Sequence, residues 1–92
     1  MADLTGANLD EAVLVDAQLD GAQIADASLQ QVNLTRATLR GANMSGARLI
    51  GATLDGADLH DVDLSGANAM AAHFREARLT GANLAGINLT AA

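Results

Sequence analysis

A hydrophobic side chain recurs at every fifth position of this chain, and the spacing never changes. Alanine, valine or isoleucine lies two residues before each of these 18 centres, and all nine glycines lie two residues after a centre. The centres are Leu4, Leu9, Leu14, Leu19, Ile24, Leu29, Leu34, Leu39, Met44, Leu49, Leu54, Leu59, Leu64, Ala69, Phe74, Leu79, Leu84 and Leu89. A period of five therefore runs through the whole sequence.

Neither an α-helix nor a straight β-strand can bury a residue at every fifth position. Five helical residues turn by about 500°, which scatters the centres around the cylinder, and five strand residues place successive centres on opposite faces. The chain must therefore bend once per repeat. In an extended segment Ala7 and Leu9 point the same way, and the glycines fall where a corner requires a positive φ. Asp16, Asp26 and Asp61 occupy three of the other corners.

The runs Ala42-Asn43-Met44-Ser45-Gly46 and Ala82-Asn83-Leu84-Ala85-Gly86 resemble the A(D/N)LxG consensus of the pentapeptide-repeat family. This resemblance covers the whole chain. It implies an all-β fold, a right-handed quadrilateral β-helix with four repeats in each coil. We expect one domain over residues 1–92, with 18 repeats in about 4.6 coils of 20 residues, forming a rod about 22 Å long. We expect no capping helix, which departs from many members of the family.

The charged residues supply independent support for a coil of four repeats. Four of the five arginines lie 20 positions after an acid, whereas no two acids and no two arginines have this spacing. The predicted pairs are Arg36 with Asp16, Arg40 with Asp20, Arg75 with Asp55 and Arg78 with Asp58. Opposite charges on neighbouring strands are favourable and like charges are not. We also predict that Phe74 points inward and takes the space left by the small Ala69, the centre before it.

Composition excludes several classes of protein. The net charge is −6, from 11 acids and five arginines, which argues against direct binding to nucleic acid or to an anionic membrane. The sequence has no cysteine and no run of 18 apolar residues, so it predicts neither disulfides nor a transmembrane helix. The amino-terminal residues do not resemble a signal peptide, and the expected location is the cytoplasm.

No group of side chains predicts catalysis, a cofactor or a metal site. His60 and His73 are expected to be solvated on different faces. Asp58 and Asp63 are expected to lie on two different faces, and Asp61 at the corner between them. Three or four convergent ligands would be needed for a metal. The six asparagines are expected to bond to nearby backbone at the corners; they are Asn8, Asn33, Asn43, Asn68, Asn83 and Asn88. The sequence therefore predicts a protein that is not an enzyme.

Two functional hypotheses remain open. The first is a structural or interaction scaffold that forms homo-oligomers through its coil ends, with Leu4, Leu84 and Leu89 as interface candidates, because end coils expose unpaired backbone. Side-face contacts to a protein partner are also predicted, and their candidates are Val13, Val15, Ile50 and Met70. The alternative follows from the family resemblance, since quinolone-resistance members are acidic mimics of DNA that bind DNA gyrase or topoisomerase.

Overall fold

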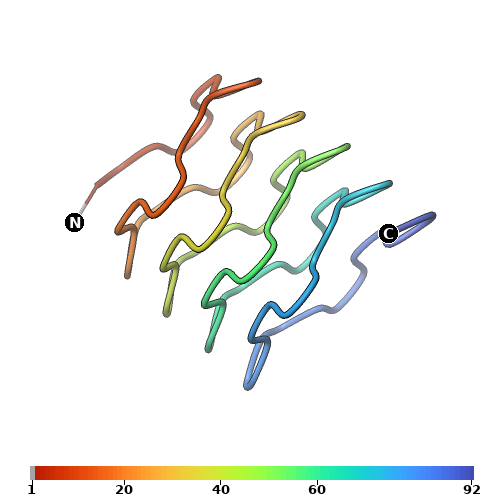
Figure 1. The fold of residues 1–92 in the computed structure, drawn as a ribbon. Helices are drawn as coiled ribbons and strands as arrows, with labels where there is room; N and C mark the ends of the chain where they lie inside the picture. Colours follow the sequence, from red (N-terminus) through yellow and green to blue (C-terminus); the bar gives the residue numbers. More distant parts are fainter. Residues whose placement is uncertain (1) are drawn as a thin grey trace.

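The computed structural model describes residues 2–92, which wind into successive coils stacked along one axis (Figure 1). Fourteen isolated parallel β-bridges join neighbouring coils, and each bridge pairs residues 20 apart, from Asp3 with Gln23 to Asn68 with Asn88. Within residues 2–92 the extended segments are a single bridge residue long, and there is no helix. The spacing of 20 that the charges predicted is therefore the register of the backbone.

Each repeat has five positions, which we name the inner residue, the bridge residue, the centre, the first corner residue and the second corner residue. The repeat from Ala22 to Asp26 shows how its backbone is paired. Gln23 N–H donates to the previous coil at Ala2 O (2.9 Å), while Ile24 and Asp26 donate to the following coil at 2.7 and 2.9 Å. Ala27 N–H donates to Ile24 O at 3.3 Å and closes the corner. The first corner N–H is the one N–H of the repeat that has no backbone acceptor.

Every second corner residue has a positive φ, as the glycine pattern predicted. The nine glycines have φ between 66° and 73°, and Asp16, Asp26 and Asp61 have φ between 58° and 61°. Because the other central residue of the turn keeps a negative φ, the corners have the form of type II turns. Six further corners hold residues that are not favoured at positive φ; these are Glu11, Gln31, Arg36, Ala71, Glu76 and Ala91.

Substitution of Gly41 by alanine is expected to lower the free energy of unfolding by about 1 kcal/mol, the cost of a left-handed conformation for an L-residue. Gly41 has a φ of +66°, and an added Cβ would meet no atom within 4 Å, so the substitution isolates the backbone cost. The reverse change, Ala71→Gly at φ 58°, is expected to raise stability. Urea unfolding measures both changes, and equal stability of Gly41→Ala and the parent would contradict this account.

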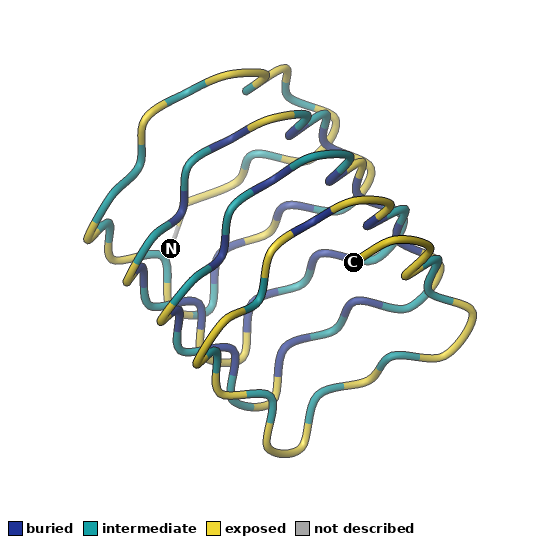
Figure 2. Ribbon diagram, turned by 45° about the vertical axis from the view of Figure 1, so that its right-hand side comes forward, coloured by how far each residue is buried: buried dark blue, intermediate teal, exposed yellow. Residues whose placement is uncertain are grey.

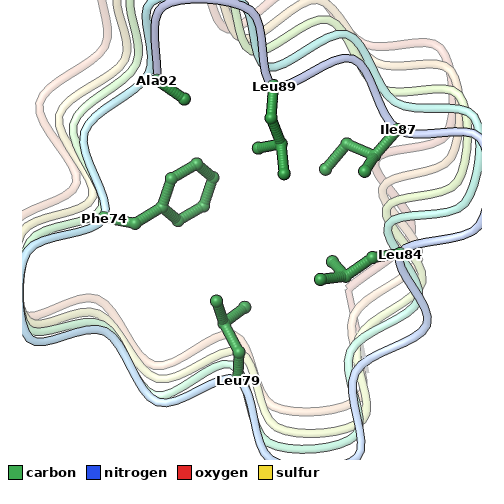
Figure 3. Close-up of a pocket in the computed structure, with 6 residues that line it drawn as sticks. All are labelled: Phe74, Leu79, Leu84, Ile87, Leu89 and Ala92. Atoms are coloured by element: carbon green, nitrogen blue, oxygen red, sulfur yellow. The ribbon is translucent and has the colours of Figure 1, made fainter.

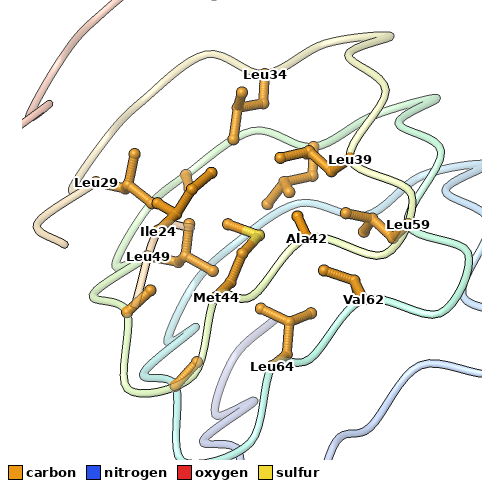
Figure 4. Close-up of a cluster of buried hydrophobic side chains, with 14 of the residues drawn as sticks. Ile24, Leu29, Leu34, Leu39, Ala42, Met44, Leu49, Leu59, Val62 and Leu64 are labelled. Atoms are coloured by element: carbon orange, nitrogen blue, oxygen red, sulfur yellow. The ribbon is translucent and has the colours of Figure 1, made fainter. Parts of the chain in front are cut away.

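The core is a column of small and medium-sized apolar side chains inside the coils. Inner residues and centres both point inward, as the sequence predicted: Ala27 and Leu29 are 0% and 1% exposed. The 21 buried hydrophobic residues all lie between Ala22 and Ala72, and no described polar residue is buried. Figure 2 shows the buried segments in the middle coils, and Figure 4 shows neighbouring coils contributing to one cluster. The terminal coils are less buried because each has a neighbouring coil on one side only.

Two predictions about shape have different outcomes. The ring of Phe74 points into the coil and packs against the buried cluster while remaining half-buried, which confirms its inward direction (Figure 3). Its compensation of the small Ala69 stays a prediction. The rod-like proportions were wrong: the principal extents are 31 × 25 × 24 Å, so no dimension is much longer than the other two.

Candidate interaction surfaces

The charged ladder on the outer surface agrees with the predicted register but not with all the predicted ion pairs. Arg36 Nε lies 2.9 Å from Asp16 Oδ1, as predicted, and this pairing raises the pKa of Arg36. Arg40 instead directs its guanidinium to Asp58 Oδ2 at 3.1 Å. Arg78 does lie one coil from Asp58, as predicted, but within residues 2–92 no ion pair joins Arg78 to Asp58 or Arg40 to Asp20. The two observed pairs are exposed, and each contributes little to stability.

Asp20 and Asp55 contact the predicted arginines through the backbone and not through the guanidinium. Arg40 N–H donates to Asp20 Oδ1 at 2.9 Å, and Arg75 N–H donates to Asp55 Oδ1 at 3.0 Å. Within residues 2–92 no ion pair joins Arg75 to Asp55. The physical reason is that a backbone N–H is held in place by the coil, whereas ordering a long arginine side chain costs conformational entropy.

The asparagines have the structural role that the sequence predicted. In all six repeats the Oδ1 atom accepts the N–H of the first corner residue two positions later, at 3.0 to 3.2 Å. Asp3, Asp58 and Asp63 occupy the same position and make the same bond. The hydroxyl groups of Thr5 and Ser65 reinforce two of these bonds, and this lowers the pKa of Asp3 and of Asp63. These side chains supply the acceptor for the first corner N–H, for which the backbone provides none.

Three acids perform this task from the neighbouring coil, a role that the sequence analysis missed. Asp10, Asp20 and Asp55 accept the first corner N–H of the residue 20 positions later, at 2.9 to 3.0 Å. The repeats they serve carry Ser28, Thr38 and His73 at the bridge position, where an asparagine or aspartate would otherwise act. This complementarity was the available signal: each of the three acids at a first corner position lies 20 residues before the first corner of a repeat that lacks a local acceptor.

The histidines and the acidic stretch are accounted for by local contacts. His60 Nε2 lies 3.2 Å from Asp61 Oδ2 and is partly exposed, while His73 is exposed on a different side. Asp58 accepts from His60 N–H and from Arg40, and Asp63 accepts from Ser65. Among residues 2–92 no three such side chains converge in a way that could hold a metal ion.

The predicted side-face contacts lie at different levels of the stack. Val13 is 76% exposed and Val15 is half-buried, and both belong to the first coil, residues 3–22. Ile50 is half-buried and Met70 is 38% exposed, and they occupy equivalent positions one coil apart. Val13 and Met70 are therefore the most accessible of the four. Their contact with a partner stays a prediction.

The carboxyl-terminal end of the stack carries an apolar hollow of about 300 Å³. Figure 3 shows its side chains pointing toward one another from around the last coil. The hollow is lined by Phe74, Leu79, Leu84, Ile87, Leu89 and Ala92. Leu84 is half-buried and Leu89 is 44% exposed. At the other end Leu4 is likewise half-buried, so the three predicted interface candidates all lie on terminal coils.

Among the described residues, no helix has the length and apolar character needed to span a bilayer.

Comparison with solved structures identifies close relatives of the fold. A pentapeptide repeat protein from the cyanobacterium Cyanothece 51142 matches with a TM-score of 0.93 and 36% identity, over 94% of this chain and 58% of that one. One from the thylakoid lumen of Arabidopsis thaliana matches with a TM-score of 0.68 and 28% identity, over 91% and 62%. Trypsin-treated QnrB1, a plasmid-mediated fluoroquinolone resistance protein, matches with a TM-score of 0.52 and 17% identity, over 97% and 61%, which shows a shared fold alone.

The chain therefore corresponds to about three-fifths of the length of these structures. No curated protein sequence matches it. The family model described as pentapeptide repeats matches residues 2–36, 33–68 and 72–92, with eight copies. Proteins of this kind form right-handed β-helices. The repeat pattern, the one-coil register of the β-bridges and these matches show that the chain belongs to the pentapeptide-repeat family.

Proposed function

We propose that this protein is a non-catalytic scaffold, a right-handed quadrilateral β-helix of about 4.6 coils that self-associates through its coil ends. The observation that carries the proposal is the apolar hollow on the last coil, where Leu84 and Leu89 expose surface that equivalent residues in the middle coils bury. Burial of such surface is favourable by about 25 cal/mol for each Å². Terminal backbone groups that lack partners add to the tendency to associate.

Sedimentation at protein concentrations spanning about two decades tests the proposal, because self-association depends on concentration by mass action. The average mass is expected to rise with concentration, and Leu89→Asp is expected to reduce the rise by placing a charge in the hollow. Met70→Asp is the matched control, because Met70 and Leu89 are similarly exposed at 38% and 44% but Met70 lies on a side face. Circular dichroism confirms that both variants fold. A monomer at every concentration would contradict the proposal.

The acidic DNA mimic is the alternative function, and the net charge of −6 is the observation that favours it. Eight of the 11 acids, however, contact donors of their own chain; they are Asp3, Asp10, Asp16, Asp20, Asp55, Asp58, Asp61 and Asp63. Such contacts support a structural role for much of the acidic surface. Inhibition of DNA gyrase supercoiling at low micromolar protein, retained in Leu89→Asp, would place this alternative above the scaffold.

A further inference from the structure

The two ends of the stack present complementary sets of backbone groups. In the last coil, residues 73–92, the N–H group of each centre and of each second corner residue has no acceptor within residues 2–92. The four inner C=O groups of this coil likewise have no donor within residues 2–92. In the first coil, residues 3–22, the groups of the coil-to-coil ladder that lack a partner within residues 2–92 are the bridge N–H groups and the bridge and first corner C=O groups. One end thus carries eight donors and four acceptors, and the other carries four donors and eight acceptors.

These free groups distinguish contacts between unlike ends of two copies from contacts between like ends. First coil against last coil places free N–H groups opposite free C=O groups and continues the ladder that joins neighbouring coils within the chain. First coil against first coil places eight carbonyls opposite eight carbonyls, and last coil against last coil opposes N–H groups in the same way. Unpaired buried backbone groups are costly. Backbone complementarity therefore favours the head-to-tail arrangement.

Charge favours the same arrangement. Residues 1–30 contain six acids and no arginine, whereas residues 31–92 contain five acids and five arginines, so the net charge of −6 resides in the amino-terminal segment 1–30. The first coil carries five acids, and the last coil carries Arg75, Arg78 and one acid, Glu76. Two first coils would repel each other, whereas a first coil and a last coil attract.

We infer that a second copy of this chain stacks head to tail, with its first coil on the last coil of its neighbour; the inference rests on the proposed self-association. Because the coil rises along the stack axis, its last residue leaves a step on the end of the stack. This step restricts how the second copy can be rotated about the axis. A copy placed without a gap would put its Ala2 in the position of Ala92. A shift by one further repeat removes this overlap and places Asp3 above Arg78, Leu4 above Leu79 and Thr5 above Thr80.

Such an interface joins two different surfaces, so each added copy leaves a free end of each kind. A heterologous contact whose rotation does not close produces open filaments, whereas a head-to-head contact stops at a dimer. The head-to-tail arrangement therefore predicts a series of species that extends beyond the dimer.

Cysteine cross-linking tests the polarity cleanly because the chain has no cysteine of its own. Thr5→Cys and Thr80→Cys place thiols at two exposed first corner positions, which would lie about 4.8 Å apart on adjacent coils of the stack. A short bis-thiol reagent is expected to join an equimolar mixture of the two single variants into mixed dimers as the main product. Each single variant alone is expected to give none, and the double variant is expected to give a ladder of products beyond the dimer.

Thr90→Cys is the matched control for the register, because Thr90 is also an exposed first corner residue of the last coil but lies on another side. Stronger linkage of Thr5→Cys to Thr90→Cys than to Thr80→Cys would overturn the register. Dimers from the single variants, without mixed dimers, would overturn the head-to-tail polarity and leave the proposed self-association intact. Sedimentation of all variants as monomers, with no cross-linking, would overturn both proposals.

Discussion

Deletion of residues 43–62 is expected to give a folded, shorter β-helix, whereas deletion of Thr53 alone is expected to abolish the fold. The first deletion removes one whole coil and joins Ala42 to Asp63, so every later repeat moves down by one coil and keeps its position in the pattern of five. The second deletion leaves one repeat a residue short. Every later centre then moves by one position relative to the coils before it, which turns inward side chains away from the core.

The expected loss in the Thr53 deletion is the whole free energy of folding, which is about 5–15 kcal/mol for a domain. The deletion of one coil is expected to lose a fraction of stability, because the stability of a repeat protein is close to a sum over its repeats and interfaces. Far-ultraviolet circular dichroism and thermal unfolding of the two variants and the parent measure the difference. A cooperative transition at the parent's temperature in the Thr53 deletion would show that the register does not determine the fold.

Substitution of Leu54 by alanine is expected to lower the free energy of unfolding by about 2–5 kcal/mol. Leu54 is 0% exposed and lies between the coils that contribute Leu34 and Phe74 to the same column. The substitution removes buried methyl groups and leaves a cavity that the neighbouring coils cannot fill, because their backbones are fixed by the ladder of hydrogen bonds. In a core with few large side chains, one such cavity is a large fraction of the total stability.

Leu89→Ala is the matched control, since it removes the same atoms from a terminal residue that is 44% exposed. Its expected cost is about 1 kcal/mol or less, because much of the side chain already contacts water. Urea unfolding of both variants, fitted with a common slope, gives the two values. Equal costs for Leu54→Ala and Leu89→Ala would indicate that the coils collapse around the missing side chain.

The sequence predicted the features that repeat. The inward direction of residues such as Ala27 and Leu29, the positive φ of the glycine corners and the spacing between bridged residues all follow from patterns with a fixed period. The backbone role of the asparagines was predicted for the same reason, because the bond from Asn43 to Ser45 N–H joins residues only two apart. Such features depend on local geometry, and the residues that determine them recur in every repeat.

The features decided by the tertiary structure depend on competition between groups in different coils. Arg40 could approach Asp20 or Asp58, and the outcome depended on Asp20 accepting the fixed N–H of Arg40, which left its guanidinium to Asp58. The exposure of Leu89 depends likewise on its place at the end of the stack, although its repeat resembles the others. By itself the sequence determined the coil, its corners and its core, because these are periodic and local. The partners of the charged side chains and the apolar hollow at the carboxyl-terminal end were decided only when the coils were stacked, because each depends on which groups lie one coil away.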